Sequence, residues 1–290
     1  MALGDDLRMA LERHEIEMYY QPQVAVPSGT INGLEALARW NHPTRGLVCP
    51  SNFIPVAEKA GTIVPLGHWI VDDVCRQVAL WRAELPGLPR VSINLSAAQL
   101  RASPDFDREF AAILGKYGLD GSAIELELTE SVLMQTTREN GQMIERLRAL
   151  GASLAIDDFG TGYSSMEYLG AFQANHIKIA QEFVRDLGSD AGHAAIVRAT
   201  IGLARELGIK VIAEGVETAD QLDFLIKAGC ENIQGYYFSH PVPASEAGRL
   251  LRKGRLEPAR PDRPDDPGRG DKLKAMPVQK PGVEFTPRRN

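Results

Sequence analysis

The sequence contains few cysteines and no excess of basic residues, and both shortages exclude classes of protein. Its three cysteines, Cys49, Cys75 and Cys230, are scattered, odd in number and without metal-ligand spacing, which fits a reducing compartment. The 38 acidic and 32 basic residues give a net charge of −6. A protein that binds phosphate backbones normally has a basic excess, so no nucleic-acid polymer is expected as a partner. An anionic ligand would need local compensation by metal ions or by a few placed cations.

Long apolar runs are also missing. No such run approaches the roughly 18 residues that are needed to span a bilayer. The N-terminal segment, MALGDDLRMALERHE, mixes acidic, basic and apolar residues as an amphipathic helix does, and it lacks the pattern of a signal peptide. We therefore expect a soluble, cytoplasmic chain that makes no membrane contact of its own.

The apolar sequence that is present is sufficient for a large core. Hydrophobic residues make up 44% of the 290 positions, and about 250 residues is typical of a (β/α)8 barrel. The chain could hold one such barrel or two ordinary domains. Over residues 256–290 the sequence becomes rich in proline and charge and poor in core-forming residues. We predict a folded domain over 1–255 and a disordered tail over 256–290.

Short apolar strands alternate with helical patterns along the folded part. The expected strands cover 16–26, 30–40, 90–95, 123–129, 154–156, 176–179, 210–213 and 232–235, and the longer helices 50–60, 65–85, 105–117, 137–150, 192–207 and 218–228. About eight alternations with short connections imply an α/β fold with a mainly parallel sheet. We favour a closed (β/α)8 TIM-like barrel over an open doubly wound sheet, because polar residues follow nearly every strand, as expected where all strand ends meet on one rim.

The centre of this pattern is the stretch LAIDDFGTGYSS, residues 154–165. Asp157 and Asp158 end its strand. Because side chains alternate along a strand, these two carboxylates can converge only where the strand breaks into a loop. Adjacent like charges are costly unless a cation lies between them, which favours a divalent metal site. A solvated Asx-type turn is the alternative interpretation.

The other strand ends favour the metal site. Their polar residues are Gln21, Glu35, Asn94, Glu127, Asp157 with Asp158, Lys178, Glu214 and Gln234. Oxygen ligands dominate this set and it contains no histidine or cysteine, so it favours Mg²⁺ or Mn²⁺ over Zn²⁺. His176 begins its strand, and we expect it to have a buried structural role. Glu125 shares strand parity with Glu127 and is expected to point inward one layer deeper, also as a structural residue.

Several motifs make a family resemblance specific. The chain resembles the EAL family of cyclic di-GMP phosphodiesterases over about residues 5–250. The matching motifs are EALARW at 35–40, YYQPQ at 19–23, NLS at 94–96, ELTES at 127–131, DDFGTGYSS from 157, IKI at 177–179, AEGVE at 213–217 and QGYYFSHP at 234–241. The fold that this resemblance implies is a (β/α)8 barrel with one antiparallel strand.

The resemblance also implies a two-metal hydrolase that converts cyclic di-GMP to linear pGpG. One Mg²⁺ or Mn²⁺ ion would be held by Glu35, Asn94, Glu127 and Asp157. Asp157 would bridge to a second ion, which Asp158 also holds together with Glu214 and Gln234, directly or through water. Two such ions can activate a water and stabilise both oxygens of an in-line displacement at phosphorus. Glu35 and Asp157 thus count as catalytic residues as well as ligands.

Further site residues follow from the same resemblance. Lys178 would orient the attacking water or neutralise charge on the phosphate, although it could simply balance the acids. Glu214 could be a general base or a ligand. Arg39 would bind a phosphate oxygen, and Asn94 and Asp158 would also contact the substrate. Gln21, Leu37 and Pro241 would line the nucleotide pocket, with ordinary packing an equal alternative for the last two.

Other features of the sequence concern the regulation of the domain and its catalytic competence. Glu130 is expected to accept hydrogen bonds from the DFGTGYSS loop and so to hold Asp158 in place. In the family this loop lies beside a dimer contact, so a homodimer is expected, and the N-terminal segment resembles the seam after a sensor or GGDEF domain. Family members usually have an acid where this chain has Ala180. A silent cyclic di-GMP receptor and a metallohydrolase acting on other phosphodiesters are the two alternative functions.

Overall fold

The structure is a computed structural model that describes residues 3–134, 138–162, 169 and 172–258. Eight strands close into a barrel, and two short strands extend its sheet. The barrel strands are β1 (Ile16–Ala25), β2 (Thr30–His42), β4 (Arg90–Asn94), β5 (Ile124–Thr129), β6 (Ser153–Phe159), β7 (His176–Ile179), β8 (Lys210–Ala213) and β9 (Asn232–Gln234), and the additional strands are β3 (Gly46–Val48) and β10 (Val242–Pro243).

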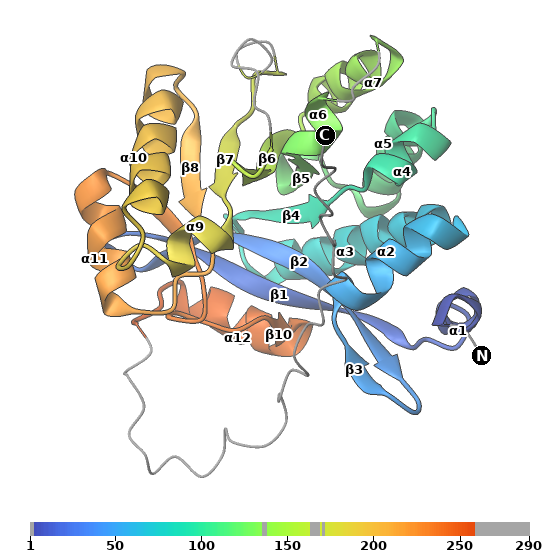
Figure 1. Ribbon diagram of the computed structural model, residues 1–290. Coiled ribbons are helices and arrows are strands. Elements are labelled where there is room, and N and C mark those ends of the chain that lie inside the picture. The colour runs from blue at the N-terminus through green and yellow to red at the C-terminus, as the bar shows by residue number, and fades with distance from the viewer. Residues whose placement is uncertain (1–2, 135–137, 163–168, 170–171, 259–290) are drawn as a thin grey trace, which may run out of the picture. The chain divides into compact units, whose positions relative to one another are not determined.

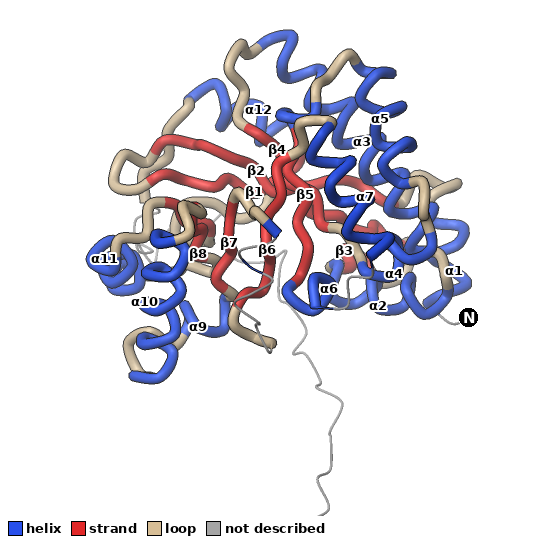
Figure 2. The backbone as a smooth tube through the Cα atoms, turned by 90° about the horizontal axis from the view of Figure 1, so that it is seen from above, coloured by secondary structure: helices blue, strands red, loops and turns tan. Residues whose placement is uncertain are grey.

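The barrel closes through β1, which pairs with both β2 and β9. Both of these pairings are antiparallel, whereas the pairings from β2 through β4, β5, β6, β7 and β8 to β9 are all parallel. The predicted barrel with one antiparallel strand is therefore confirmed. Figure 2 shows the strands at the centre, with helices around the outside.

Helices follow most strands and cover the outer surface of the barrel (Figure 1). Among the described residues, none of them is both long and apolar enough to cross a bilayer. They are α1 (Leu3–Ala10), α2 (Pro50–Ala60), α3 (Ile63–Glu84), α4 (Ala97–Ala102), α5 (Phe106–Tyr117), α6 (Glu130–Met134), α7 (Arg138–Ala149), α9 (Gln181–Arg185), α10 (Ala191–Glu206), α11 (Ala219–Ala228) and α12 (Ala244–Lys253), with a 3-10 turn at Gly121–Ala123.

Local sequence explains where the predicted helices begin and end. Helix α11 has a capping box, in which the Thr218 side chain accepts from the Gln221 backbone while the Gln221 side chain accepts from the Thr218 backbone. It ends at Gly229, whose φ of 87° lies in the left-handed region that favours glycine. Helices α4, α9 and α12 and the short strands β3 and β10 were not predicted from the sequence.

The hydrophobic core lies between the strands and the surrounding helices, not inside the barrel. Outward side chains of the β1–β2 hairpin pack on helices, with Tyr20 edge-on to Trp81 at 4.8 Å and Trp40 edge-on to Phe53 at 5.9 Å between ring centroids. The inward positions of the same strands are mostly polar, and among them Gln21, Gln23 and Glu35 are buried. This arrangement directs the polar strand-end residues into the barrel mouth.

Candidate active site

The carboxyl ends of the parallel strands deliver the predicted polar residues to one mouth of the barrel. Glu35, Glu127, Asp157 and Lys178 lie within their strands, Asn94 and Gln234 are the last residues of β4 and β9, and Glu214 follows β8 directly. Gln21 joins them from β1, where it pairs with Glu35 in the strand register. Most of these side chains are buried, so their charges interact through little water.

Lys178 lies at the centre of this cluster. Its side chain is fully buried, and its Nζ is 2.6 Å from both Glu127 Oε2 and Glu214 Oε1. Glu35 Oε2 and Asp157 Oδ1 lie 3.3 and 3.4 Å from the same nitrogen. Burial alone would lower the pKa of Lys178, but the four carboxylates outweigh it and raise that pKa well above its ordinary value. The lysine is therefore a fixed cation among four acids.

One lysine does not neutralise the acids. Burial, together with the nearby Glu35 and Asp157 carboxylates, raises the pKa of Glu127 well above its usual range. Burial likewise raises the pKa of Glu214 to about 8 and, with the neighbouring Asp157 charge, raises that of Asp158. Each of these acids would be more easily ionised beside a further cation.

Amide side chains hold Glu35 in place. Its Oε1 accepts from Asn94 Nδ2 at 2.7 Å, and its Oε2 accepts from Gln234 Nε2 at 2.5 Å. Gln234 Nε2 also lies 3.0 Å from Gln21 Oε1, and Gln21 Nε2 donates to the Ser239 carbonyl at 3.0 Å. Burial alone would raise the pKa of Glu35, but the Lys178 charge and the hydrogen bonds from Gln234 and Asn94 outweigh it and lower that pKa.

The backbone at the end of β6 explains how two consecutive aspartates converge. Asp158 has a φ of 52°, in the left-handed region, and the β6–β7 pairing is irregular between Ile156 and Phe159. This irregularity breaks the strand alternation, which convergence of the two carboxylates requires. Of the residues that the structure describes, Asp157, Asp158 and Glu214 are the group of three whose ligand oxygens all lie within 4.8 Å of one another.

Two further buried oxygens lack hydrogen-bond partners. They are Oε1 of Glu127 and Oε1 of Gln234. Such orphaned acceptors are costly, and a cation would satisfy them. The donors are all carboxylate or amide oxygens, the ligands that Mg²⁺ and Mn²⁺ prefer. The residues present therefore fit a divalent metal centre, although the carboxylates of the predicted first-ion set lie around the Lys178 ammonium and not within 4.8 Å of one another.

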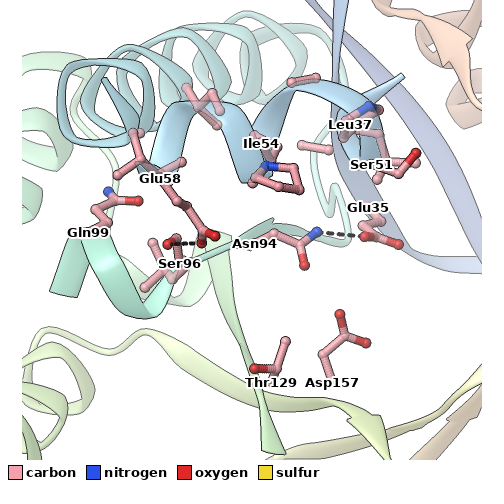
Figure 3. Close-up of a pocket in the computed structure, with 18 of the residues that line it drawn as sticks. Glu35, Leu37, Ser51, Ile54, Glu58, Asn94, Ser96, Gln99, Thr129 and Asp157 are labelled. Atoms are coloured by element: carbon pink, nitrogen blue, oxygen red, sulfur yellow. Dashed lines mark hydrogen bonds between the residues drawn. The ribbon is translucent and has the colours of Figure 1, made fainter. Parts of the chain in front are cut away.

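A cavity of about 450 Å³ opens beside the cluster. Figure 3 shows Glu35, Asn94 and Asp157 on one side of it and Glu58, Ser96 and Gln99 on the other, at the end of α2 and the start of α4. The predicted residues Leu37 and Asp158 also line it. Its size and mixed lining are typical of a pocket for a small molecule.

Three predicted substrate residues lie outside this lining. Gln21 belongs to the amide network, and Pro241 follows the loop that this network anchors. Arg39 lies over the Tyr19 ring at 5.6 Å and donates to the Ala38 carbonyl at 2.9 Å.

Conversely, most of the other residues that line the cavity were not predicted from the sequence, and Glu58 is the charged one among them. Glu58 accepts from Ser96 Oγ at 2.5 Å on the same side of the cavity. Ser96 ends the NLS motif and caps α4, a signal that could have drawn attention to this contact.

A family model described as the EAL domain matches residues 4–241. The chain belongs to the EAL domain family. A relative from Pseudomonas aeruginosa, named bifunctional diguanylate cyclase/cyclic di-GMP phosphodiesterase MucR, is 43% identical over 246 residues, which cover 85% of this chain and 36% of that protein. The cyclic di-GMP phosphodiesterase PdeR of Escherichia coli is 42% identical over 251 residues, covering 87% of this chain and 38% of PdeR.

Solved structures agree with this family assignment. The structure of the PaMucR phosphodiesterase in complex with c-di-GMP has a TM-score of 0.82 and 42% identity, and the match covers 85% of this chain and 100% of that one. The EAL enzyme Bd1971, in a form bound to cAMP and cyclic di-GMP, has a TM-score of 0.82 and 34% identity over 86% of this chain and 68% of its own. The present chain spans about a third of the length of the two curated relatives.

Glu130, the first residue of α6, binds the backbone of the loop that follows β6. Its Oε2 accepts from the backbone N–H of Gly160 at 3.0 Å and of Gly162 at 3.3 Å. A Cβ at Gly162 would lie 3.0 Å from Glu130 Oε1, so a larger residue would crowd this contact. The expected hydrogen bonds to this loop are therefore present, while its residues 163–165 lie outside the described residues.

Ala180, where the sequence departs from the usual EAL pattern, is the N-cap residue of α9. It is buried, and no side-chain hydrogen bond caps this helix. An acid or hydroxyl at this position would be suited to accept from the first-turn N–H groups of α9. The missing acid therefore removes a cap two residues after Lys178.

Proposed function

We propose that this EAL domain hydrolyses cyclic di-GMP to linear pGpG with two Mg²⁺ or Mn²⁺ ions. The observation that carries the proposal is the gathering of four carboxylates around Lys178, with amides of Asn94 and Gln234 on Glu35, beside a cavity of about 450 Å³. The names of MucR and PdeR support the substrate, as does the c-di-GMP in the PaMucR complex.

The oxygens divide into two ligand sets. Glu35, Asn94, Glu127 and Asp157 would hold one ion, and Asp157, Asp158, Glu214 and Gln234 the other. When bound, the ions would lower the pKa of a water and polarise the phosphate oxygens. The mutual proximity of Asp157, Asp158 and Glu214 and the orphaned oxygens of Glu127 and Gln234 support this division.

The remaining charged groups act on the phosphate and on protons. Lys178 is placed to stabilise negative charge on the pentacovalent phosphate or to orient the attacking water. Glu214, with its pKa raised to about 8 by burial, can accept the proton of that water if it is not itself a ligand. Arg39 would bind a phosphate oxygen, and Gln21, Leu37 and Pro241 would border the nucleotide.

A turnover assay tests this proposal. The purified chain is incubated with cyclic di-GMP and Mn²⁺ or Mg²⁺, and pGpG is followed by chromatography. We expect pGpG with either ion and none with EDTA. Binding of cyclic di-GMP without product over hours would instead identify a receptor, for which the uncapped Ala180 position is the one structural argument. Cleavage of a model diester without binding of cyclic di-GMP would identify a different metallohydrolase.

The protein context is part of the same proposal. We propose a cytoplasmic homodimer that contacts its partner through the EAL domain, with a sensor or GGDEF domain upstream in the full-length protein. The domain would occupy residues 1–255, although Leu256 of the predicted tail is buried and its N–H donates to the Gly29 carbonyl at 2.8 Å. Residues 259–290 of that tail lie outside the described residues. Light scattering across a concentration series tests the dimer, because a mass that stays at 31.7 kDa at every concentration would contradict it.

A further inference from the structure

A second polar layer lies inside the barrel, below the proposed metal site. It consists of inward residues two positions from the site residues on the same strands, after the site residue on the antiparallel β1 and before it on the other strands, and each is at most 7% exposed. They are Gln23, Ser92, Glu125, His176 and Asn232. The interior of a (β/α)8 barrel is usually filled by bulky branched aliphatic residues, so this polar layer needs a reason.

Glu125 is the centre of the second layer. Its Oε2 accepts from His176 Nδ1 at 2.5 Å, because an ionised carboxylate can only accept and Nδ1 must carry the hydrogen. Its Oε1 accepts from Ser92 Oγ at 2.9 Å and lies 2.9 Å from Arg90 Nε. Both carboxylate oxygens are thus fully engaged, and Arg90 balances the charge.

The two layers make two parallel bridges between the same pair of strands. Glu125 and Glu127 are both on β5, and His176 and Lys178 are both on β7. The lower bridge joins Glu125 to His176, and the upper bridge joins Glu127 to Lys178 at 2.6 Å. These strands do not pair with each other, because β6 lies between them.

Ala155 makes this arrangement possible. It is the residue of β6 that pairs with Glu127 on one side and with His176 on the other, and it is fully buried. It has the inward parity of Asp157, so a methyl group is all that β6 places between the two bridges. A larger side chain would fill the space across which His176 reaches Glu125.

A contribution to the stability of the fold does not by itself explain the lower bridge between Glu125 and His176. Buried charged networks often contribute no more to the free energy of unfolding than well-packed apolar residues of the same volume. Such a network can instead hold the strands that it joins in one fixed arrangement. β7 has only four residues, and it must hold the Lys178 ammonium among four acids.

We propose that His176 and Glu125 are positioning residues, whose bond fixes β5 relative to β7 and thereby sets Glu127 and Lys178 at their working distance. This inference rests on the proposed function, since it assigns the role of the lower layer in that same reaction. His176 and Glu125 contact neither substrate nor ions and act through their strand neighbours.

The test uses variants that differ in the hydrogen bond at Nδ1. His176→Leu removes the donor and leaves Glu125 balanced by Arg90, whereas His176→Asn places an amide N–H near the former position of Nδ1. Ser92→Ala removes one hydrogen bond from Glu125 without changing any charge. Asp107→Asn weakens the ion pair with Arg146 between α5 and α7, two helices that carry none of the site residues, and is the matched control for lost stability.

The readouts are kcat and KM for cyclic di-GMP, the Kd of Mn²⁺ by calorimetry without substrate, and Tm. We expect His176→Leu to lower kcat about tenfold or more with KM within about twofold, because a small misplacement of a catalytic group costs rate. Its Kd for Mn²⁺ should rise about threefold or more. His176→Asn should restore most of both values, Ser92→Ala should lower kcat about threefold, and Asp107→Asn should change only Tm.

Three results would overturn the inference. They are wild-type kcat and Mn²⁺ affinity in a folded His176→Leu variant, equal defects in His176→Asn and His176→Leu, and a loss of kcat in Asp107→Asn that follows its Tm. If His176→Leu does not fold, unchanged kcat and Mn²⁺ affinity in Ser92→Ala overturn it instead. If the wild-type chain shows no turnover, the proposed function fails, and the Mn²⁺ Kd of the same variants still decides the positioning role.

Discussion

At the residue scale, the site depends on the balance between the positive charge of Lys178 and the negative charges of the acids around it in the barrel mouth. Lys178 contacts four carboxylates, while amides from Asn94 and Gln234 hold Glu35. Because so few side chains carry so much of the electrostatics, single substitutions should separate activity from folding.

Glu35→Ala is the sharpest of these substitutions. It removes a proposed ligand of the first ion, so we expect turnover of cyclic di-GMP to fall by at least about a thousandfold, an effect on the scale of removing a key electrostatic group. The fold should persist, because removing one of the four acids around Lys178 lessens their mutual repulsion while Lys178 keeps its contacts with Glu127 and Glu214. Activity and circular dichroism measured on the same preparation check this, and retained activity in a folded variant would contradict the first-ion assignment.

Glu125 makes a prediction about acid stability. Its interactions with His176 and Arg90 outweigh burial and lower its pKa from 4.5 to about 2. A carboxylate with a lowered folded-state pKa stabilises the fold above its unfolded value and loses that contribution as the pH falls. The loss should occur between about pH 4.5 and pH 2, with an upper limit of about 3 kcal/mol.

Urea denaturation at a series of pH values measures this contribution. The unfolding free energy of the wild-type chain should fall more steeply in that window than that of Glu125→Gln, whose amide does not titrate. Parallel curves for the two proteins would show that Glu125 does not have the assigned pKa.

At the element scale, most barrel strands share one construction, a short apolar run with an inward polar residue at its end or directly after it. This explains why the strands and the barrel could be predicted from the residues, whereas the antiparallel strand was expected only from the resemblance to the EAL family. Helix α12 could not, because its few apolar residues, Ala247, Leu250 and Leu251, gain meaning only from packing against the closed barrel. Asp158 was predicted at the site, but its φ of 52° is set by the irregular β6–β7 pairing and has no sequence signal.

The lining of the cavity shows the same limit of prediction from the sequence. Asn94 and Asp158, which follow from strand ends, and Leu37, which was expected from the family resemblance, line it as predicted, whereas Glu58 comes from helix α2. Which face of α2 meets the cavity depends on tertiary packing. Strand parity could be derived from the sequence because it is local, while the approach of a helix to a strand end could not.

The short helix α9 gives an element-scale prediction. Ala180→Ser supplies a hydroxyl at its uncapped N-terminus and should raise the unfolding free energy by about 1 kcal/mol. Ala180→Asp supplies a cap and a charge. We expect Ala180→Asp to raise kcat and Ala180→Ser to leave it unchanged, if the acid helps to orient Lys178. Denaturant curves and initial rates of both variants check this, and equal rates in all three proteins would make position 180 neutral for catalysis.

At the scale of the whole molecule, ions that bind only the folded barrel should stabilise it. At a concentration of 100 times Kd the gain is about 2.7 kcal/mol, which for a domain of this size corresponds to a rise in Tm of about 5–10 °C. We expect Mn²⁺ to produce this shift in the wild-type chain and EDTA to reverse it.

Two variants test whether the rise in Tm comes from Mn²⁺ bound at the proposed site. Asp158→Ala removes one of the three clustered ligands and should reduce the shift by at least half, whereas Glu206→Ala removes an exposed acid at the end of α10 and should not. Equal shifts in both variants would mean that Mn²⁺ stabilises the chain through a site elsewhere.

Because the barrel closes through β1, the order in which the ribosome synthesises the chain determines when the site can form. Gln21 and Glu35 belong to the first two strands, while Gln234, which bonds to both, belongs to the last strand of the barrel, β9. A ribosome therefore releases the first two strands long before Gln234, one of the hydrogen-bond donors to Glu35, has been made. The acids of the mouth acquire their complete set of neighbours only after residue 234 has emerged, so a truncated product lacks both the seam of the cylinder and the finished pocket.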